Sequence, residues 1–258
     1  MELGLQGKVA VVTGGSEGIG KATALKLAQE GAHVVIAARR EDVLKRAASD
    51  IQAAATDAQV LAVPTDVTSS EDVERLIART VEKFGRLDIL INNAGTANAK
   101  SFEAASDELW QQDLDLKLHA AVRTIRAALP HLKQRGGRII NITTPAGKQP
   151  GARSLPTSVS RAAGIALTKA LSKEFAEHRI LVNTVCVGLI KSAQQERHGE
   201  ARGLSVEEHY QELGKSVPLR RVGEAAEVAN VVAFLASEAA SYVTGTSVNV
   251  DGGSSGVV

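Results

Sequence analysis

The segment Val9–Gly20, with the sequence VAVVTGGSEGIG, constrains the fold of this chain more than any other stretch. Its first four residues are apolar and mostly β-branched, which is typical of a buried strand. The glycines of a GxxxGxG pattern then fall at Gly14, Gly18 and Gly20, and helical apolar spacing begins at Ile19. A strand, a glycine turn and a helix together aim free backbone N–H groups and the positive end of a helix dipole at a phosphate. The segment therefore predicts a phosphate-binding turn for a nucleotide.

Strands and helices alternate along the rest of the chain, which predicts an α/β fold: a Rossmann-type, doubly wound parallel sheet with helices on both faces. The expected strands are 9–12, 33–38, 60–64, 87–91, 138–143, 180–186 and 247–250. The expected helices are 19–30, 41–55, 70–84, 107–134, 155–177 and 224–236. Residues 191–216 are polar and lack a clear period, so they are interpreted as an insertion that covers the site. Because no repeat or linker interrupts the pattern, residues 1–258 are expected to form a single dinucleotide-binding domain.

Charge and composition exclude several other functions. The formal net charge is +1, which gives no reason to expect nucleic acid or an anionic membrane as a partner. Cys186 is the one cysteine of the sequence, so a disulfide framework is excluded and a reducing, cytoplasmic location is expected. The first residues lack a signal-peptide pattern, and no apolar run approaches the ~20 residues of a membrane span. No metal site is predicted.

Motifs spread over essentially the whole chain resemble the short-chain dehydrogenase/reductase family, and most closely its branch of 3-oxoacyl-acyl-carrier-protein reductases and sugar or steroid alcohol dehydrogenases. The resemblance rests on TGGSEGIG at 13–20, Asp66-Val67, NNAG at 92–95, GRIINIT at 137–143, VNTVCVG at 182–188, PLRRVGEAAEVANVVAFLASEAASYVTG at 218–245 and VNVDGG at 248–253. It implies a seven-stranded doubly wound sheet, a nicotinamide dinucleotide, a small-molecule substrate and usually a homotetramer. The helices predicted at 107–134 and 155–177 match those that the family uses as a dimer interface, so a homotetramer or homodimer is expected.

The end of the second predicted strand favours NADP(H), with NAD(H) as the alternative. Family members that prefer NAD carry an acidic residue at the position of Ala38, where it binds the ribose hydroxyls and repels a 2′-phosphate. Here Arg39 and Arg40 follow instead, and a guanidinium forks onto phosphate oxygens. Glu17, inside the glycine turn, opposes a phosphate.

The resemblance also supplies the other cofactor contacts. Asp66 and Val67 match the family's adenine contacts, and the backbone of residues 93–95 matches the path under the ribose and nicotinamide. Residues 188–192 match the segment at the carboxamide end, although Val187 replaces the usual proline. The expected cofactor-binding residues are Gly14, Ser16, Glu17, Gly18, Ile19, Gly20, Arg39, Arg40, Asp66, Val67, Asn93, Ala94, Gly95, Arg161, Gly188, Ile190 and Ser192.

The family's four usual catalysts are all replaced in this chain. The tyrosine and lysine, four residues apart on one helix, fall at Thr157 and Arg161. The serine after the GRIINI strand falls at Thr144, which keeps a hydroxyl. The asparagine, seven residues after the helix's tryptophan, falls at Lys117. The sequence therefore predicts an altered route for the proton.

The chemistry of the replacements limits their roles. Thr157 can relay a hydrogen bond but does not ionise near neutral pH, and Arg161 can clamp a ribose but cannot pass on a proton. Lys117 is a new ionisable group, and like charge from Arg161 would lower its pKa. The alternative for Lys117 is that it points away and pairs with Asp113 or Asp115.

Other proton donors lie in the 191–216 insertion. Tyr210 is a candidate catalytic residue there, and His198 and His209 lie on the same segment, which a mobile lid could bring to the site. Three functions stay open. The first is an active oxidoreductase acting on a carbonyl, an alcohol or a conjugated C=C bond. The second is a nucleotide-binding sensor or inactive subunit, and the third is a non-redox lyase on the same fold.

Overall fold

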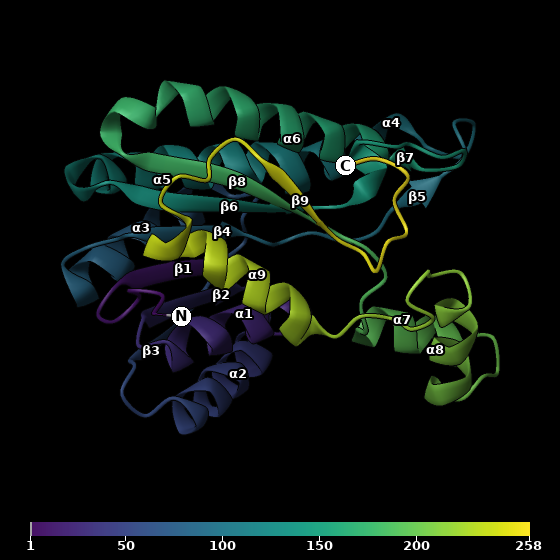
Figure 1. Ribbon diagram of the computed structural model, residues 1–258, viewed down its shortest axis with the longest axis horizontal. Helices are drawn as coiled ribbons and strands as arrows, with labels where there is room; N and C mark the ends of the chain where they lie inside the picture. Colours follow the sequence, from purple (N-terminus) through teal and green to yellow (C-terminus); the bar gives the residue numbers. More distant parts are fainter. Residues whose placement is uncertain (1) are drawn as a thin grey trace.

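The computed structural model describes residues 2–258 and contains the expected doubly wound sheet (Figure 1). Seven parallel strands lie in the order β3-β2-β1-β4-β6-β8-β9. Their bounds are β1 Val9–Thr13, β2 His33–Ala38, β3 Val60–Pro64, β4 Ile89–Asn92, β6 Gly137–Thr143, β8 Ile180–Val187 and β9 Ser247–Val250. A separate antiparallel pair joins β5, Ala99–Lys100, to β7, Leu155–Pro156. The predicted fold class is confirmed.

Helices cover both faces of the sheet (Figure 1). One face carries α1 Gly18–Gln29, α2 Glu41–Ala54 and α9 Ala225–Ala236, and the other carries α3 Ser70–Phe84, α5 Ala120–Arg135 and α6 Thr157–Glu174. Each face has its own apolar core, and β1, an interior strand of the sheet, is buried over its whole length. Strands buried on both faces need continuous apolar runs, which explains why VAVV precedes the glycine turn. No helix within residues 2–258 is both long and apolar enough to cross a bilayer.

Three segments differ from the expectations. The helix predicted at 107–134 is α4, Asp107–Leu114, then a π-helical turn, Asp115–His119, then α5. The segment predicted as a helix at 155–177 begins as the short strand β7, and α6 starts only at Thr157. Within 191–216, two helices form, α7 Ala193–Glu200 and α8 Val206–Gly214. Serine side chains cap both of them, a local signal that can start a helix without apolar periodicity.

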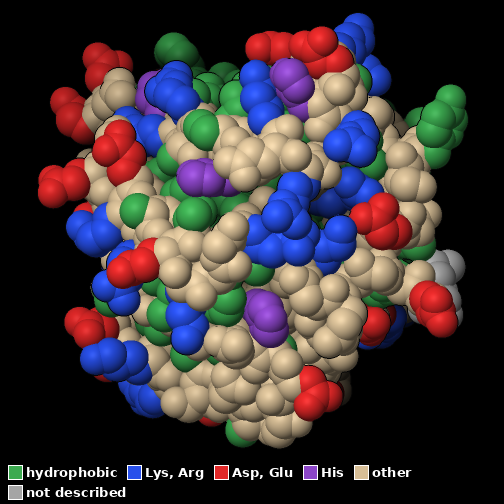
Figure 2. Space-filling view, turned by 90° about the vertical axis from the view of Figure 1, so that its left-hand side faces the viewer, with side chains coloured by type: hydrophobic (Ala, Val, Ile, Leu, Met, Phe, Trp, Pro, Cys, Tyr) green, Lys and Arg blue, Asp and Glu red, His purple; other side chains and the backbone are tan. Residues whose placement is uncertain are grey.

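The two ends of the sheet differ in character. The carboxyl ends of the strands point toward β5, β7 and α7, at the right of Figure 1. Figure 2 shows the opposite end, where Lys and Arg side chains gather near the centre and hydrophobic side chains form only small scattered areas. In a doubly wound sheet, ligands bind at the carboxyl ends of the strands, so the site is sought at the first of these ends.

Candidate functional site

The glycine turn between β1 and α1 is shaped to receive a phosphate. Gly14 and Gly18 have φ angles of +65° and +53°, a region that favours glycine. A Cβ on Gly20 would lie 2.1 Å from the Gly14 carbonyl oxygen, whereas a Cβ on Gly18 would meet nothing within 4 Å. The first helical turn therefore packs tightly on the strand while the space at Gly18 stays open. This cradle fits the pyrophosphate of a dinucleotide.

The end of β4 is tied to the glycine turn. Thr13 Oγ1 accepts hydrogen bonds from the backbone N–H groups of Asn93 and Ala94, at 3.0 and 3.1 Å. The Asn93 amide donates to the carbonyl oxygens of Thr13 and Gly14. The predicted ribose and nicotinamide segment, 93–95, is thus fixed beside the predicted phosphate turn.

Arg39 and Arg40 both lie exposed after β2, as expected for a subsite on the adenosine side. The Arg40 guanidinium pairs with the Glu17 carboxylate of the glycine turn. Ser16, in the same turn, is buried, and Ile19 is half-buried in the first turn of α1. An acid thus lies among the residues expected to meet a 2′-phosphate.

The other expected cofactor contacts line the same end of the sheet. Asp66 Oδ1 accepts from the backbone N–H and the hydroxyl of Thr68, and Val67 is buried. Gly188 follows β8, where an added Cβ would lie 2.7 Å from Asp251. Ile190 is buried, and Ser192 caps α7. These residues lie in loops that follow β3 and β8.

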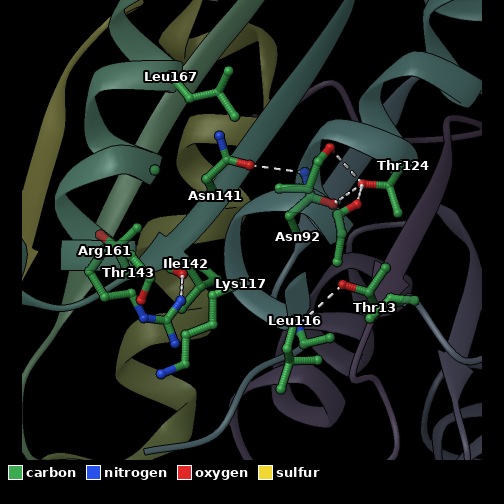
Figure 3. Close-up of a pocket in the computed structure, with 16 residues that line it drawn as sticks. Thr13, Asn92, Leu116, Lys117, Thr124, Asn141, Ile142, Thr143, Arg161 and Leu167 are labelled. Atoms are coloured by element: carbon green, nitrogen blue, oxygen red, sulfur yellow. Dashed lines mark hydrogen bonds between the residues drawn. The ribbon is translucent and has the colours of Figure 1, made fainter. Parts of the chain in front are cut away.

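Arg161 reaches from α6 to the end of β6 (Figure 3). Its Nη1 donates to the Ile142 carbonyl oxygen at 2.8 Å, and its buried Nε has no partner among the described residues. A Cβ on Gly95 would lie 2.9 Å from Arg161 Nη2, so glycine leaves room for the guanidinium. Burial lowers the pKa of Arg161, but an arginine begins so high that it stays a cation. Arg161 can therefore hold polar oxygens and cannot transfer a proton.

Lys117 and Thr157 meet in the interior, next to Arg161. Lys117 Nζ donates to Thr157 Oγ1 at 2.9 Å and also contacts Asp113 Oδ1. The side chains of Lys117 and Asp113 are fully buried, and Asp113 Oδ2 accepts from Ser160 Oγ at 2.6 Å. The proposed pairing of Lys117 with Asp113 is thus observed, but the lysine points toward Thr157 and not away from the site. Asp115, the other suggested partner, pairs with Arg123.

The environment of Lys117 pulls its pKa in two directions. Burial lowers the pKa below the usual lysine range, the hydrogen bond to Asp113 raises it, and the charge of Arg161 lowers it further. The net direction is downward. A lysine whose pKa is lowered in this way gives up its proton more readily than a solvent-exposed lysine.

Two further features can receive ligand atoms. Thr144 Oγ1, at the end of β6, is buried with no hydrogen-bond partner within residues 2–258. A cavity of about 20 Å³ lies between Lys117 and Arg161 on one side and Asn92 and Asn141 on the other (Figure 3). It has room for about one water molecule with several polar partners.

Tyr210 occupies a different place. Its hydroxyl accepts from the Ser192 backbone N–H at 3.0 Å and lies 3.3 Å from Glu196 Oε1. Burial raises the pKa of this phenol. His209 packs against Gly199, and His198 is exposed. In this structure Tyr210 therefore joins α8 to the start of α7 and is not part of the Lys117 cluster.

Asp113 and Ser160 belong to this site although neither was expected among the site residues. Their signal was spacing, since Asp113 lies one helical turn before Lys117, and Ser160 lies three residues after Thr157. Among the described residues, no group of three or more His, Cys, Asp and Glu side chains could hold a metal ion.

The fold and glycine turn define a nucleotide-binding, doubly wound protein, and comparisons with known proteins identify its family. A family model described as enoyl-(acyl carrier protein) reductase matches residues 14–255. A 3-oxoacyl-[acyl-carrier-protein] reductase from Synechocystis is 38% identical over 251 residues, 96% of this chain and 97% of the relative. The chain belongs to the short-chain dehydrogenase/reductase family.

Two solved structures are similar over nearly their whole length. L-sorbose reductase from Gluconobacter frateurii, complexed with NADPH and L-sorbose, has a TM-score of 0.95 at 35% identity, with 100% of both chains covered. An NADPH-bound short chain oxidoreductase from Pseudomonas aeruginosa, described as containing an atypical catalytic center, has a TM-score of 0.93 at 33% identity, covering 97% of this chain and 98% of that one.

Proposed function

We propose that this protein is an NADP(H)-dependent oxidoreductase that reduces a carbonyl group to an alcohol, with Lys117 and Thr157 supplying the proton. The observation that carries the proposal is the 2.9 Å hydrogen bond from Lys117 Nζ to Thr157 Oγ1. This hydrogen bond joins the ionisable ammonium of Lys117 to the hydroxyl of Thr157, the residue that stands where the family usually has its tyrosine.

The residues that would hold the cofactor fit it. The open space at Gly18 admits a pyrophosphate, and the unpartnered Nε of Arg161 is available to a ligand oxygen. Arg39 is exposed and available for a 2′-phosphate, and the two NADPH-bound relatives support NADP(H) over NAD(H). When bound, the cofactor supplies a hydride to the carbonyl carbon or accepts one from the alcohol.

Thr157 is placed to give a proton to the substrate oxygen. Its Oγ1 accepts from Lys117 Nζ and from the Asn98 backbone N–H, at 2.9 and 3.3 Å. A hydroxyl has one hydrogen to donate, and two accepted bonds leave that hydrogen free for a substrate oxygen. As Thr157 gives up its proton, Lys117 Nζ replaces it, so threonine never has to ionise. Lys117 is left neutral and regains a proton from solvent, while Thr144 Oγ1 orients the substrate oxygen.

The same geometry disfavours use of Thr157 as a nucleophile. A lysine that activates a hydroxyl for acyl transfer must be neutral and must accept the hydroxyl's proton. Here Asp113 contacts Lys117 Nζ and favours the ammonium. We therefore assign the pair to proton donation.

The test combines cofactor binding with turnover. We expect NADPH to bind more tightly than NADH. We also expect at least one compound in a panel of ketones, sugars and enoyl thioesters to oxidise bound NADPH. Lys117→Met and Thr157→Val should each lower kcat for reduction by about 10²–10⁴-fold, the usual contribution of general acid catalysis, with little change in NADPH affinity. Lys173→Met, an exposed lysine on the same helix as Thr157, is the matched control.

Two outcomes would favour the other functions. Tight NADPH binding without turnover of any panel member would support the sensor or inactive subunit. The observation that favours this function is that threonine, unlike tyrosine, does not ionise near neutral pH. Failure to bind either nucleotide would instead support a non-redox lyase, although the open glycine turn argues against that reading.

A further inference from the structure

Asp113 is a fully buried acid of the site, and its contacts extend beyond the ion pair with Lys117. It lies in the last turn of α4 and has no exposed surface. One carboxylate oxygen contacts Lys117 Nζ in the π-helical turn, and the other accepts from Ser160 Oγ on α6 at 2.6 Å. The carboxylate therefore connects the two helical segments that carry Lys117 and Thr157.

The charge balance explains why a carboxylate is needed there. Lys117 and Arg161 are both cations by nature, and both lose solvation in the interior. Asp113 is the acidic group that faces Lys117 from α4, and Arg161 is the charged group that faces it from α6. Without Asp113, the buried ammonium would face the repulsion of Arg161 with no opposite charge in contact, so the pKa of Lys117 would fall further.

Stability alone is a poor reason to keep such a pair. A buried ion pair often adds no more stability than apolar side chains of similar volume, because both charges lose their hydration. Ser160 has a role besides packing. Its hydroxyl donates a hydrogen bond to Asp113 Oδ2, and fixing that oxygen also sets the direction of Asp113 Oδ1, which contacts Lys117. These contacts aim Lys117 Nζ at Thr157 Oγ1.

We propose that Asp113, oriented by Ser160, is the positioning residue of this site, which holds the Lys117 ammonium against the Thr157 hydroxyl. This inference rests on the proposed function, because it assigns Asp113 a part in proton delivery. It concerns residues of this chain, so it can be tested without cofactor or substrate.

The first test follows Lys117 directly in the cofactor-free protein. Lysine side-chain ¹³Cε NMR, with Lys117→Met to assign the signal, gives the titration midpoint of Lys117. Asp113→Asn should move that midpoint to lower pH by about one unit or more, the usual effect of removing an opposite charge in contact. Asp115→Asn is the matched control, because Asp115 is a nearby acid that pairs with Arg123. An unmoved midpoint in Asp113→Asn would overturn the proposal.

The second test uses the pH profile of NADPH-dependent reduction. Reduction needs protonated Lys117, so the rate should fall as the pH rises through the Lys117 pKa. Asp113→Asn should shift this fall to lower pH, and Asp113→Glu should restore part of the wild-type profile. Ser160→Ala should lower kcat by about fivefold, the effect of one lost hydrogen bond. An Asp113→Asn enzyme with a wild-type profile would contradict the proposal.

A double variant guards against loss of folding. Asp113→Leu/Lys117→Met removes both buried charges together, so it should fold at least as stably as wild type while losing reduction. A double variant that keeps the wild-type kcat would refute the roles proposed for both Asp113 and Lys117. If no carbonyl compound is ever reduced, the proposed function fails, but a moved NMR midpoint still upholds the coupling of Asp113 to Lys117.

Discussion

Arg40 faces two competing anions at the end of β2: Glu17 of its own chain and the 2′-phosphate expected from NADP(H). The Glu17–Arg40 pair is exposed, and such pairs contribute about 0.2–1 kcal/mol. A phosphate must displace this carboxylate or leave Arg40 occupied, so Glu17 should weaken the selection of NADPH over NADH.

Glu17→Gln should therefore tighten NADPH binding by about two- to fivefold while NADH affinity stays unchanged. Cofactor fluorescence titration measures both affinities, and raising the salt concentration should weaken NADPH binding more in the variant than in wild type. Glu30→Gln removes another paired acid, bound to Lys26 at the far end of α1, and is the control. Weaker NADH binding in Glu17→Gln would mean that Glu17 contacts a ribose hydroxyl instead.

The sequence predicted the location of some site residues better than that of others. Counting from recognisable motifs put Lys117, Thr157 and Arg161 together, and the structure brings them together. Spacing also identified Asp113 as a partner of Lys117, but not the direction in which the pair points. A salt bridge one helical turn apart looks the same in sequence whether it faces solvent or the interior.

At the scale of elements, the sequence predicted most of the helices and strands, but not the π-helical turn at Asp115–His119. Apolar residues continue at helical spacing through this stretch, so the pattern indicates one unbroken helix. A π-turn changes which way side chains project without changing the composition, and such turns often occur at functional sites. Here the turn carries Lys117, the new ionisable group.

Helices α7 and α8 were also not predicted from the sequence, because they depend on serine caps and on Tyr210 more than on an apolar stripe. The Tyr210 hydroxyl holds the backbone of Ser192, which the family resemblance places near the carboxamide end of the cofactor. Tyr210 can thus influence the site through the position of α7.

Tyr210→Phe should raise KM by about fivefold, since the lost hydrogen bond loosens Ser192, and should leave kcat nearly unchanged. Steady-state kinetics at fixed saturating NADPH separate the two effects. Tyr242→Phe, which alters a fully exposed tyrosine, is the control. A loss of kcat as large as that expected for Lys117→Met would make Tyr210 itself the proton donor.

At the scale of the whole molecule, the parallel sheet follows from alternating strands and helices, but the assembly of subunits does not. The resemblance assigned the dimer interface to residues 107–134 and 155–177. On α6, Val159 is 43% exposed, and Ala162 and Ala166 are exposed as well. Small apolar side chains on one helix allow a second copy to approach closely, and a twofold axis would pair this surface with itself.

A charge in the middle of that surface should therefore separate subunits without unfolding them. We expect wild-type protein at micromolar concentration to have the mass of a dimer or tetramer by light scattering. Ala166→Glu should give a smaller species, because two like charges would meet across the twofold axis. Ala53→Glu, an exposed alanine on α2 of the opposite layer, should keep the wild-type mass. A monomeric wild type would exclude the interface, and an Ala166→Glu variant of unchanged mass would move it away from α6.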